Sequence, residues 1–203
     1  MTATQPLAGV AVISLAINLP GPLAAARLTG LGAEVIKIEP PVGDPLKHMY
    51  PDYYQELTTG QEIRTIDLKD SAGGEEFASL MAEADLLLTS MRPRAAEALG
   101  LPQLVDAHGL VHVEIVGFAG DRADFPGHDL TYQAAHSTLI PGTMPTVPIA
   151  DVLGGEHAAL QALAGLREAE TRRADGQDVG RQTGGIVRRV AVSYTHLRAH
   201  ETS

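Results

Sequence analysis

The chain has 203 residues, with 15 lysines and arginines against 25 aspartates and glutamates, and 44% of its residues are hydrophobic. This length and apolar content suit about one domain with an ordinary core. The formal net charge of -10 removes the electrostatic basis for binding nucleic acid, because phosphate contacts need clustered Lys and Arg. The absence of cysteine excludes disulfides, thiolate zinc sites and cysteine nucleophiles, and it fits a reducing compartment.

The sequence also lacks the patterns of membrane and exported proteins. No apolar run approaches the roughly 20 residues that a membrane helix needs. No charged segment followed by an apolar one opens the chain, as it would in a signal peptide. We therefore expect a cytoplasmic protein whose partners are neither membranes nor nucleic acids.

The first half of the chain alternates short apolar runs of β type with helical stretches. The first strand is predicted at residues 10–15 and the first helix at 23–31, where Pro22 suits the first turn because its missing N–H needs no partner there. A second strand at 35–38 ends at two prolines. Residues 42–60 show little periodicity and many Pro, Gly, Tyr and Asp residues, so we expect a ligand-facing loop.

The remaining elements continue this alternation. In chain order we expect a strand at 64–68, a helix at 75–84, strands at 85–89 and 110–116, a loop at 118–127, a helix at 130–135 and an amphipathic helix at 151–168. The pattern is typical of βαβ units and predicts an α/β fold, with a Rossmann-like mainly parallel sheet and flanking helices. The order of the strands in the sheet cannot be read from it.

The C-terminal run from Val192 to Thr202 resembles the translation of a transposase-type sequencing adapter. We therefore assign residues 192–203 no structural role and expect the natural gene to continue past this point. His196 and His200 have the i, i+4 spacing of metal ligands on a helix. Because both fall in this tail, no metal site is predicted.

The segment from Gly127 to Tyr132 has the highest density of reactive groups, since it combines an imidazole, a carboxylate and a phenol. The common hydrolase, phosphate-loop, zinc-protease and dinucleotide motifs are absent from the sequence. His128 is a candidate acid or base, and the alternative is a loop histidine or one bonded to a helix end. Asp129 is equally well explained as the N-cap of the helix that follows it.

Two more residues are candidates for chemistry. Asp151 precedes two glycines, which let a ligand or another backbone approach closely. At a helix N-terminus the dipole and free N–H groups favour its ionised form, which suits a nucleophile or general base, whereas the alternative role is an N-cap. Arg92 follows a predicted strand at the edge where open α/β sheets bind ligands. It can hold a phosphate there, unless it is simply a solvated arginine.

A series of short motifs runs in a fixed order from Pro6 to about Gly180. They are Pro6-Leu-Ala-Gly-Val-Ala-Val-Ile, Pro20-Gly-Pro, Leu31-Gly-Ala-Glu-Val-Ile-Lys-Ile-Glu-Pro-Pro-Val-Gly-Asp, Ile66-Asp-Leu-Lys, Ala84-Asp-Leu-Leu-Leu, Arg92-Pro, Leu99-Gly-Leu, Gly127-His-Asp-Leu-Thr-Tyr-Gln-Ala and Ile149-Ala-Asp. Together they are similar to the family III CoA-transferases of the CaiB/BaiF type, a group that includes formyl-CoA transferase and α-methylacyl-CoA racemase. The order and spacing of the motifs make the resemblance specific.

The resemblance implies an N-terminal CoA-binding α/β domain at residues 6–180, with the start of a following helical segment. This domain is incomplete relative to the family fold, whose members are longer and form homodimers. The implied substrates are an acyl-CoA thioester and a carboxylic acid, with no tightly bound cofactor. Positions that match segments lining the family's CoA site are Ile66, Asp67, Leu68, Lys69, Arg92, Gly127, Asp129 and Tyr132.

Asp151 matches the catalytic aspartate of the family. In the transferases this residue attacks the thioester and forms a mixed anhydride. In the racemases it exchanges a proton with a histidine at the position of His128. Three hypotheses follow: a CoA-transferase, a racemase of 2-methylacyl-CoA, and a non-catalytic CoA-binding fragment. Pro40 departs from the family pattern, since many members have there an arginine that holds a CoA phosphate.

Overall fold

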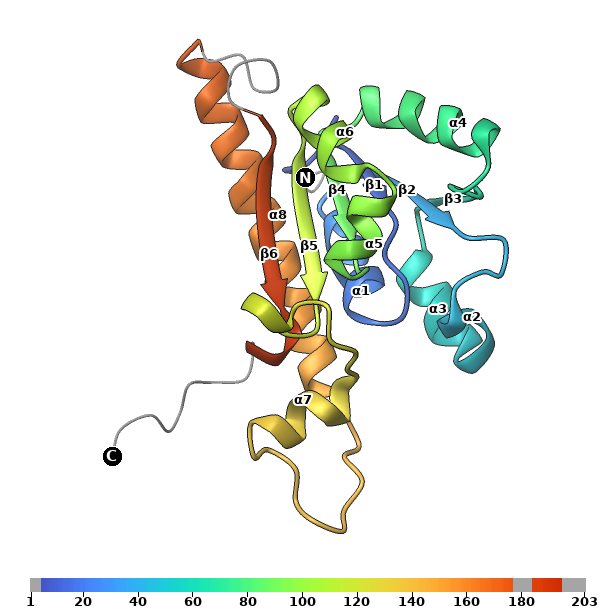
Figure 1. Cartoon of the computed structure of the whole chain (residues 1–203), viewed down its shortest axis with the longest axis vertical. Coiled ribbons are helices and arrows are strands. Elements are labelled where there is room, and N and C mark those ends of the chain that lie inside the picture. Colours follow the sequence, from blue (N-terminus) through green and yellow to red (C-terminus); the bar gives the residue numbers. More distant parts are fainter. Residues whose placement is uncertain (1–4, 177–183, 195–203) are drawn as a thin grey trace.

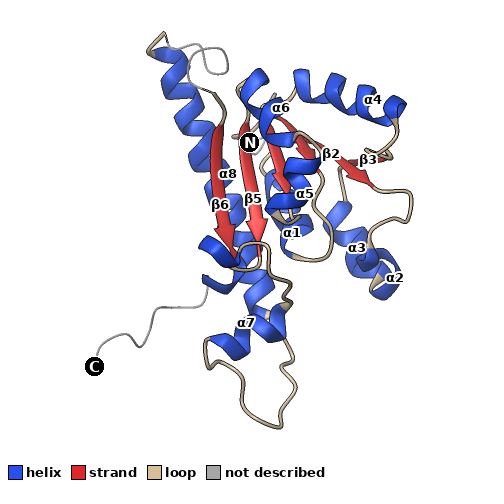
Figure 2. Cartoon of the chain, viewed as in Figure 1, coloured by secondary structure: helices blue, strands red, loops and turns tan. Residues whose placement is uncertain are grey.

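A computed structural model describes residues 5–176 and 184–194 (Figure 1). Within them, six parallel strands form one sheet with the order β3-β2-β1-β4-β5-β6 (Figure 2). The strands are β1 (Ala11–Ser14), β2 (Glu34–Glu39), β3 (Glu62–Thr65), β4 (Leu86–Thr89), β5 (Val111–Val116) and β6 (Ile186–Ala191). The predicted α/β class with a parallel sheet is confirmed.

Helices cover both faces of this sheet. They are α1 (Pro20–Gly30), α2 (Pro45–Met49), α3 (Pro51–Thr58), α4 (Ser71–Ala82), α5 (Pro93–Ala98), α6 (Leu101–His108), α7 (Asp129–Ala135) and α8 (Ile149–Ala174). Successive strand residues point to opposite faces, so Val12 joins a core with α1 and α8 whereas Ile13 joins a second core with α4, α5 and α6. None of the described helices is long and apolar enough to cross a membrane.

The long helix α8 packs closely against α1. A Cβ atom at Gly155 would lie 2.7 Å from the carbonyl oxygen of Pro20, so only glycine allows this approach. Of the two glycines after Asp151, Gly155 therefore admits a neighbouring backbone, whereas Gly154 faces the side chain of Val192. Figure 1 shows α8 running beside β5 and β6, with its N-terminal end next to α7.

The prediction of a loop at residues 42–60 is wrong, because the helices α2 and α3 form there. Each helix begins with a proline at its first position, where the missing N–H costs nothing. Asp44 caps α2 by accepting a hydrogen bond from the backbone N–H of Leu46 at 2.9 Å. Both helices are too short for a periodic apolar pattern to indicate them.

The sheet also continues beyond the domain boundary predicted at Gly180, because β6 pairs in parallel with β5. Residues 192–194 then form a short 3₁₀ turn, in which Val192 is buried against Gly154 and the N–H of Ser193 donates to the carbonyl oxygen of Gly117. The expectation that the chain has no structural role from Val192 onwards is thus corrected for these three positions. Residues 195–203, with His196 and His200, lie outside the described part.

Candidate active site at the carboxyl edge of the sheet

The order of the strands reverses between β1 and β4, so the connections leaving these neighbours run to opposite sides. Open α/β sheets bind ligands in the crevice outside this switch point. The loops that follow the two strands are joined by Ser90, whose hydroxyl accepts from the N–H of Ile17 at 3.0 Å and donates to its carbonyl oxygen at 3.2 Å. These loops form the common wall of two cavities.

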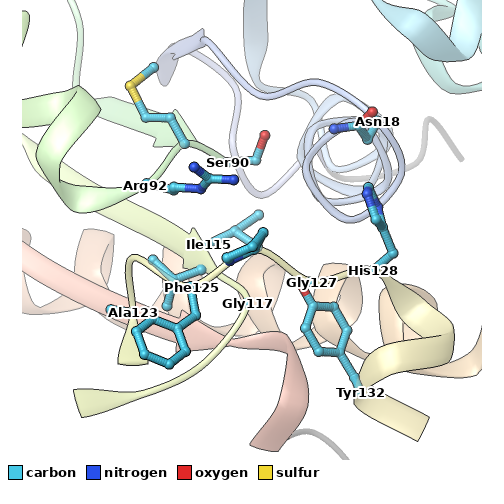
Figure 3. A pocket seen from close by; sticks show the side chains of 13 residues that line it. Asn18, Ser90, Arg92, Ile115, Gly117, Ala123, Phe125, Gly127, His128 and Tyr132 are labelled. Carbon is cyan, nitrogen blue, oxygen red and sulfur yellow. The ribbon is translucent and has the colours of Figure 1, made fainter. Parts of the chain in front are cut away.

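The first cavity, which we call the His128 cavity, has a volume of about 210 Å³ (Figure 3). In Figure 3 the side chains of Arg92 and Ser90 lie on one side and those of Asn18 and His128 on the other. Its lining comprises Asn18, Ser90, Met91, Arg92, Ile115, Val116, Gly117, Ala123, Phe125, Pro126, Gly127, His128 and Tyr132. Four of the residues proposed from the sequence therefore meet here, namely Arg92, Gly127, His128 and Tyr132.

The second cavity, the Ile66 cavity, has a volume of about 280 Å³ and a mostly apolar wall. It is lined by Leu15, Ile17, Asn18, Ile38, Pro40, Ile66, Asp67, Leu68, Lys69, Ser90, Met91 and Leu99. The predicted positions Ile66 to Lys69 thus form a group of their own. Because Asn18, Ser90 and Met91 line both cavities, the two are neighbouring parts of one cleft.

Tyr132 forms a wall of the His128 cavity and is buried between two glycines. A Cβ atom added to Gly117 would lie 2.5 Å from the Tyr132 hydroxyl oxygen, and one added to Gly127 would lie 2.4 Å from the Tyr132 ring. Any side chain at these two positions would therefore displace the ring. Burial first, and then the charges of Asp151 and Asp129, raise the pKa of Tyr132 to about 12. The phenol therefore stays neutral at physiological pH and can donate a hydrogen bond.

Asp129 does not cap its own helix. His128 is the N-cap of α7, and the carboxylate of Asp129 crosses to the start of α8. There one carboxylate oxygen, Oδ1, accepts from the N–H of Ala150 at 2.7 Å and from that of Asp151 at 3.1 Å. Its other oxygen accepts from Gln133. Asp129 is 8% exposed as a residue and is absent from the lining of both cavities, so a direct contact with CoA stays a prediction.

Asp151 is half-buried on the first turn of α8 and is not that helix's N-cap, a position that Pro148 takes. Burial, and secondly the charge of Asp129, raise the pKa of Asp151 to about 7. The expectation that the helix end favours the ionised form is therefore wrong, because burial outweighs the dipole and Asp129 occupies the N–H groups. Asp151 does not line either cavity, but it lies close enough to Tyr132 for its charge to raise the pKa of that phenol.

A buried charge cluster that the sequence analysis missed holds the loop after β1, which is part of the wall shared by the two cavities. The Nζ of Lys37 lies 2.8 Å from Asp44 Oδ2 and donates to the carbonyl oxygen of Ala16 at 2.9 Å. Asp44 Oδ1 accepts from the N–H of Asn18 at 3.1 Å, and Tyr54 donates to Glu39 at 2.6 Å. This cluster fixes Asn18 in a left-handed conformation with φ 68°, which asparagine tolerates better than most residues.

Comparison with known proteins places this chain in a defined family. A model of CoA-transferase family III matches residues 7–194. The chain is 33% identical to an (R)-2-hydroxy-4-methylpentanoate CoA-transferase of Clostridioides difficile, over 94% of this chain and 51% of that protein. It is 34% identical to a cinnamoyl-CoA:phenyllactate CoA-transferase of Clostridium sporogenes, over 82% of this chain and 45% of that protein.

A solved protein structure is also similar to this chain. A CAIB/BAIF family protein from Brucella suis has a TM-score of 0.80 with 25% sequence identity, over 94% of this chain and 54% of that one. The chain thus spans about half the length of the relatives it matches.

Proposed function

Because the chain belongs to CoA-transferase family III, we propose that the protein moves CoA between an acyl-CoA thioester and a carboxylic acid, with Asp151 as nucleophile. The observation that carries the proposal is the half-buried carboxylate of Asp151 with a pKa of about 7. It stands next to α7, whose residues His128 and Tyr132 line the cavity. A carboxylate with raised basicity and little solvation is a stronger nucleophile than an exposed one.

The proposed reaction begins when an Asp151 oxygen attacks the thioester carbonyl carbon. The carbon–sulfur bond breaks, CoA leaves as a thiolate, and the acyl group stays on Asp151 as a mixed anhydride. Return of the thiolate to the Asp151 carbonyl releases the first acid and leaves a thioester between Asp151 and CoA. The acceptor carboxylate then attacks this thioester, and a second return of the thiolate gives the new acyl-CoA and free Asp151.

We place the thioester in the His128 cavity and the rest of CoA along the Ile66 cavity. Apolar side chains of the Ile66 cavity suit the uncharged parts of CoA, and Lys69 and Arg92 are the cations of the two linings. Arg92 is exposed at the N-cap of α5, in the short connection after β4, so its guanidinium can bind a phosphate bidentately.

Replacing Arg92 with Gln is expected to weaken CoA binding by about tenfold to a hundredfold, because a charged hydrogen bond to phosphate is lost. Arg94 is the matched control, since its exposed side chain pairs with Asp124 and lines neither cavity. Isothermal titration with CoA should show little change for Arg94→Gln. Equal losses in both variants would mean that Arg92 contributes only general positive charge.

The racemase is the second candidate, and the place of His128 in the cavity lining favours it. His128 and Asp151 stand at the starts of adjacent helices that Asp129 connects, an arrangement compatible with an acid and a base acting on one carbon. The test is to incubate the full-length protein with a 2-methylacyl-CoA in D₂O without any acceptor acid. Exchange of the α-proton under these conditions would support the racemase and contradict the transferase.

Replacing His128 with Ala separates the two candidates further. If the protein is a transferase, the variant should keep CoA transfer within about tenfold, since no step of the proposed reaction needs an imidazole. A racemase variant should lose α-proton exchange by about a hundredfold to ten-thousandfold, the usual contribution of an acid–base group. Mass spectrometry of the acyl-CoA measures both reactions on one sample.

The third candidate is a non-catalytic CoA-binding fragment, as the chain spans about half the length of its relatives. CoA would then stabilise the protein against heating without any turnover, and absence of stabilisation would leave no role for CoA.

We further propose a homodimer, because the segment between α7 and α8 exposes Ile140 at 71% and Met144 at 74%. Light scattering on the full-length protein measures its mass.

A further inference from the structure

The side chain of Asp129 connects the two helices that carry the proposed acid–base and nucleophilic residues. It starts on α7, directly after His128, and ends on the first turn of α8, where it accepts the N–H groups of Ala150 and Asp151. Gln133, one turn further along α7, holds the second carboxylate oxygen. Since Asp129 is buried and all three bonds are made inside the protein, its orientation is fixed.

These bonds change the surroundings of Asp151. The first N–H groups of a helix have no partner within the helix, and the side chain of the N-cap residue normally accepts from one of them. The N-cap of α8 is Pro148, which has no side-chain acceptor. Here Asp129 takes two of them, including the N–H of Asp151 itself. Among the described residues, no donor bonds the carboxylate of Asp151.

We propose that Asp129 is a positioning residue for Asp151: it fixes the first turn of α8 and withholds that turn's N–H groups, so that the Asp151 carboxylate remains unbonded for attack on the thioester. This inference rests on the proposed function, because it takes Asp151 as the nucleophile. A carboxylate that accepts several backbone hydrogen bonds is stabilised as an anion and loses nucleophilic strength. Asp129 prevents that loss.

Among the described residues, Asp129 is the charged group that shifts the pKa of Asp151. Tyr132 and the N-cap residue His128 are the other titratable groups of α7 at this end of the two helices. Charged side chains on the other elements that pack against α8 are engaged elsewhere: Arg27 of α1 with Glu156, Glu114 of β5 with Arg189 of β6, and Arg188 of β6 with Glu168. The acid–base behaviour of Asp151 should therefore respond mainly to Asp129.

The test is an Asp129→Asn variant, in which the titration of the Asp151 carboxyl is followed by ¹³C NMR in the full-length protein. The signal is assigned by its loss in Asp151→Asn. The amide oxygen can still accept from α8 while the negative charge is gone, so the midpoint of Asp151 should fall from about 7 by roughly one pH unit. Asp175→Asn, which removes the same charge at the exposed far end of α8, should leave the midpoint unchanged.

A second variant, Asp129→Ala, is needed because the amide of Asp129→Asn can still bond the N–H groups of α8. It frees the N–H groups of Ala150 and Asp151, and the midpoint should then fall at least as far as in Asp129→Asn. An unchanged midpoint in both folded variants would overturn the proposal, whether or not Asp151 is essential.

Kinetics separate this inference from the proposed function. In Asp129→Asn the rise of kcat with pH should move to lower pH together with the NMR midpoint, because the ionised carboxylate is the nucleophile. If the NMR midpoint falls while the rate profile stays in place, Asp129 acts on Asp151 as inferred, but Asp151 is not the nucleophile.

Discussion

Asp151→Asn is expected to lower the rate of CoA transfer by about a thousandfold or more, with CoA binding changed by less than about threefold. The amide has nearly the same size but cannot attack a thioester to form an anhydride. Asp129 bonds the backbone N–H of residue 151 and not its side chain, so the start of α8 should stay in place. Initial rates with an acyl-CoA and an acceptor acid, together with CoA titrations, measure the two effects.

Glu156→Gln is the matched control for this variant. Glu156 lies on α8 shortly after Asp151, and its exposed ion pair with Arg27 contributes little. The control should keep its rate within about twofold. Transfer by Asp151→Asn at a near-normal rate would show that another residue is the nucleophile, or that no covalent intermediate forms.

The wild-type rate should also depend on pH in a defined direction. The pKa of Asp151 is raised to about 7, so its carboxyl is protonated below that pH and ionised above it. Because only the anion attacks, kcat/KM should rise as the pH increases through about 7. The usual pKa of an aspartate would place this rise near pH 4 instead.

Asp44→Ala is expected to lower the free energy of unfolding by about 3–5 kcal/mol, the typical cost of leaving one partner of a buried ion pair alone. The side chains of Lys37 and Asp44 are 1% and 0% exposed and lie 2.8 Å apart. The variant also removes the acceptor for the N–H groups of Asn18 and Leu46. Urea denaturation monitored by circular dichroism measures the change.

An exposed ion pair supplies the comparison for Asp44→Ala. Glu62 pairs with Arg64 at the edge strand β3, where water solvates both charges, so Glu62→Ala should cost less than about 1 kcal/mol. A loss below about 1 kcal/mol for Asp44→Ala would mean that the buried cluster does not support the cavity wall. Loss of CoA binding at unchanged stability would point instead to a direct contact with CoA.

The alternation of apolar runs was enough to predict the parallel α/β fold, since each buried strand is short and continuous. The sequence could not predict β6, because its run Ile186-Val-Arg-Arg-Val-Ala contains two arginines. In the structure these charges are compensated by distant residues, with Arg188 bonded to Glu168 and Arg189 to Glu114. Such partners are far away in the sequence, so the strand has no local signal.

In the candidate site, too, the residues whose roles depend on distant parts of the chain could not be predicted from the sequence. The cleft residues that the motifs indicated, such as Arg92, His128 and Ile66, do line it. Asn18 and Ser90 carried no recognisable signal, because their role depends on the meeting of the β1 and β4 loops. The contact of Asp129 with α8 was missed for a similar reason: an Asp before a helix normally caps that helix, and only the packing of α7 on α8 redirects it.

The most direct test of Asp151 as nucleophile is to trap its acyl intermediate. The full-length protein would be mixed with an acyl-CoA, quenched with hydroxylamine, digested and analysed by mass spectrometry. We predict a hydroxamate on the peptide that contains Asp151, formed only when acyl-CoA is present and absent in Asp151→Asn. A protein that transfers CoA at full rate, yet gives no hydroxamate on this peptide or gives it on another carboxylate, would show that Asp151 is not the nucleophile.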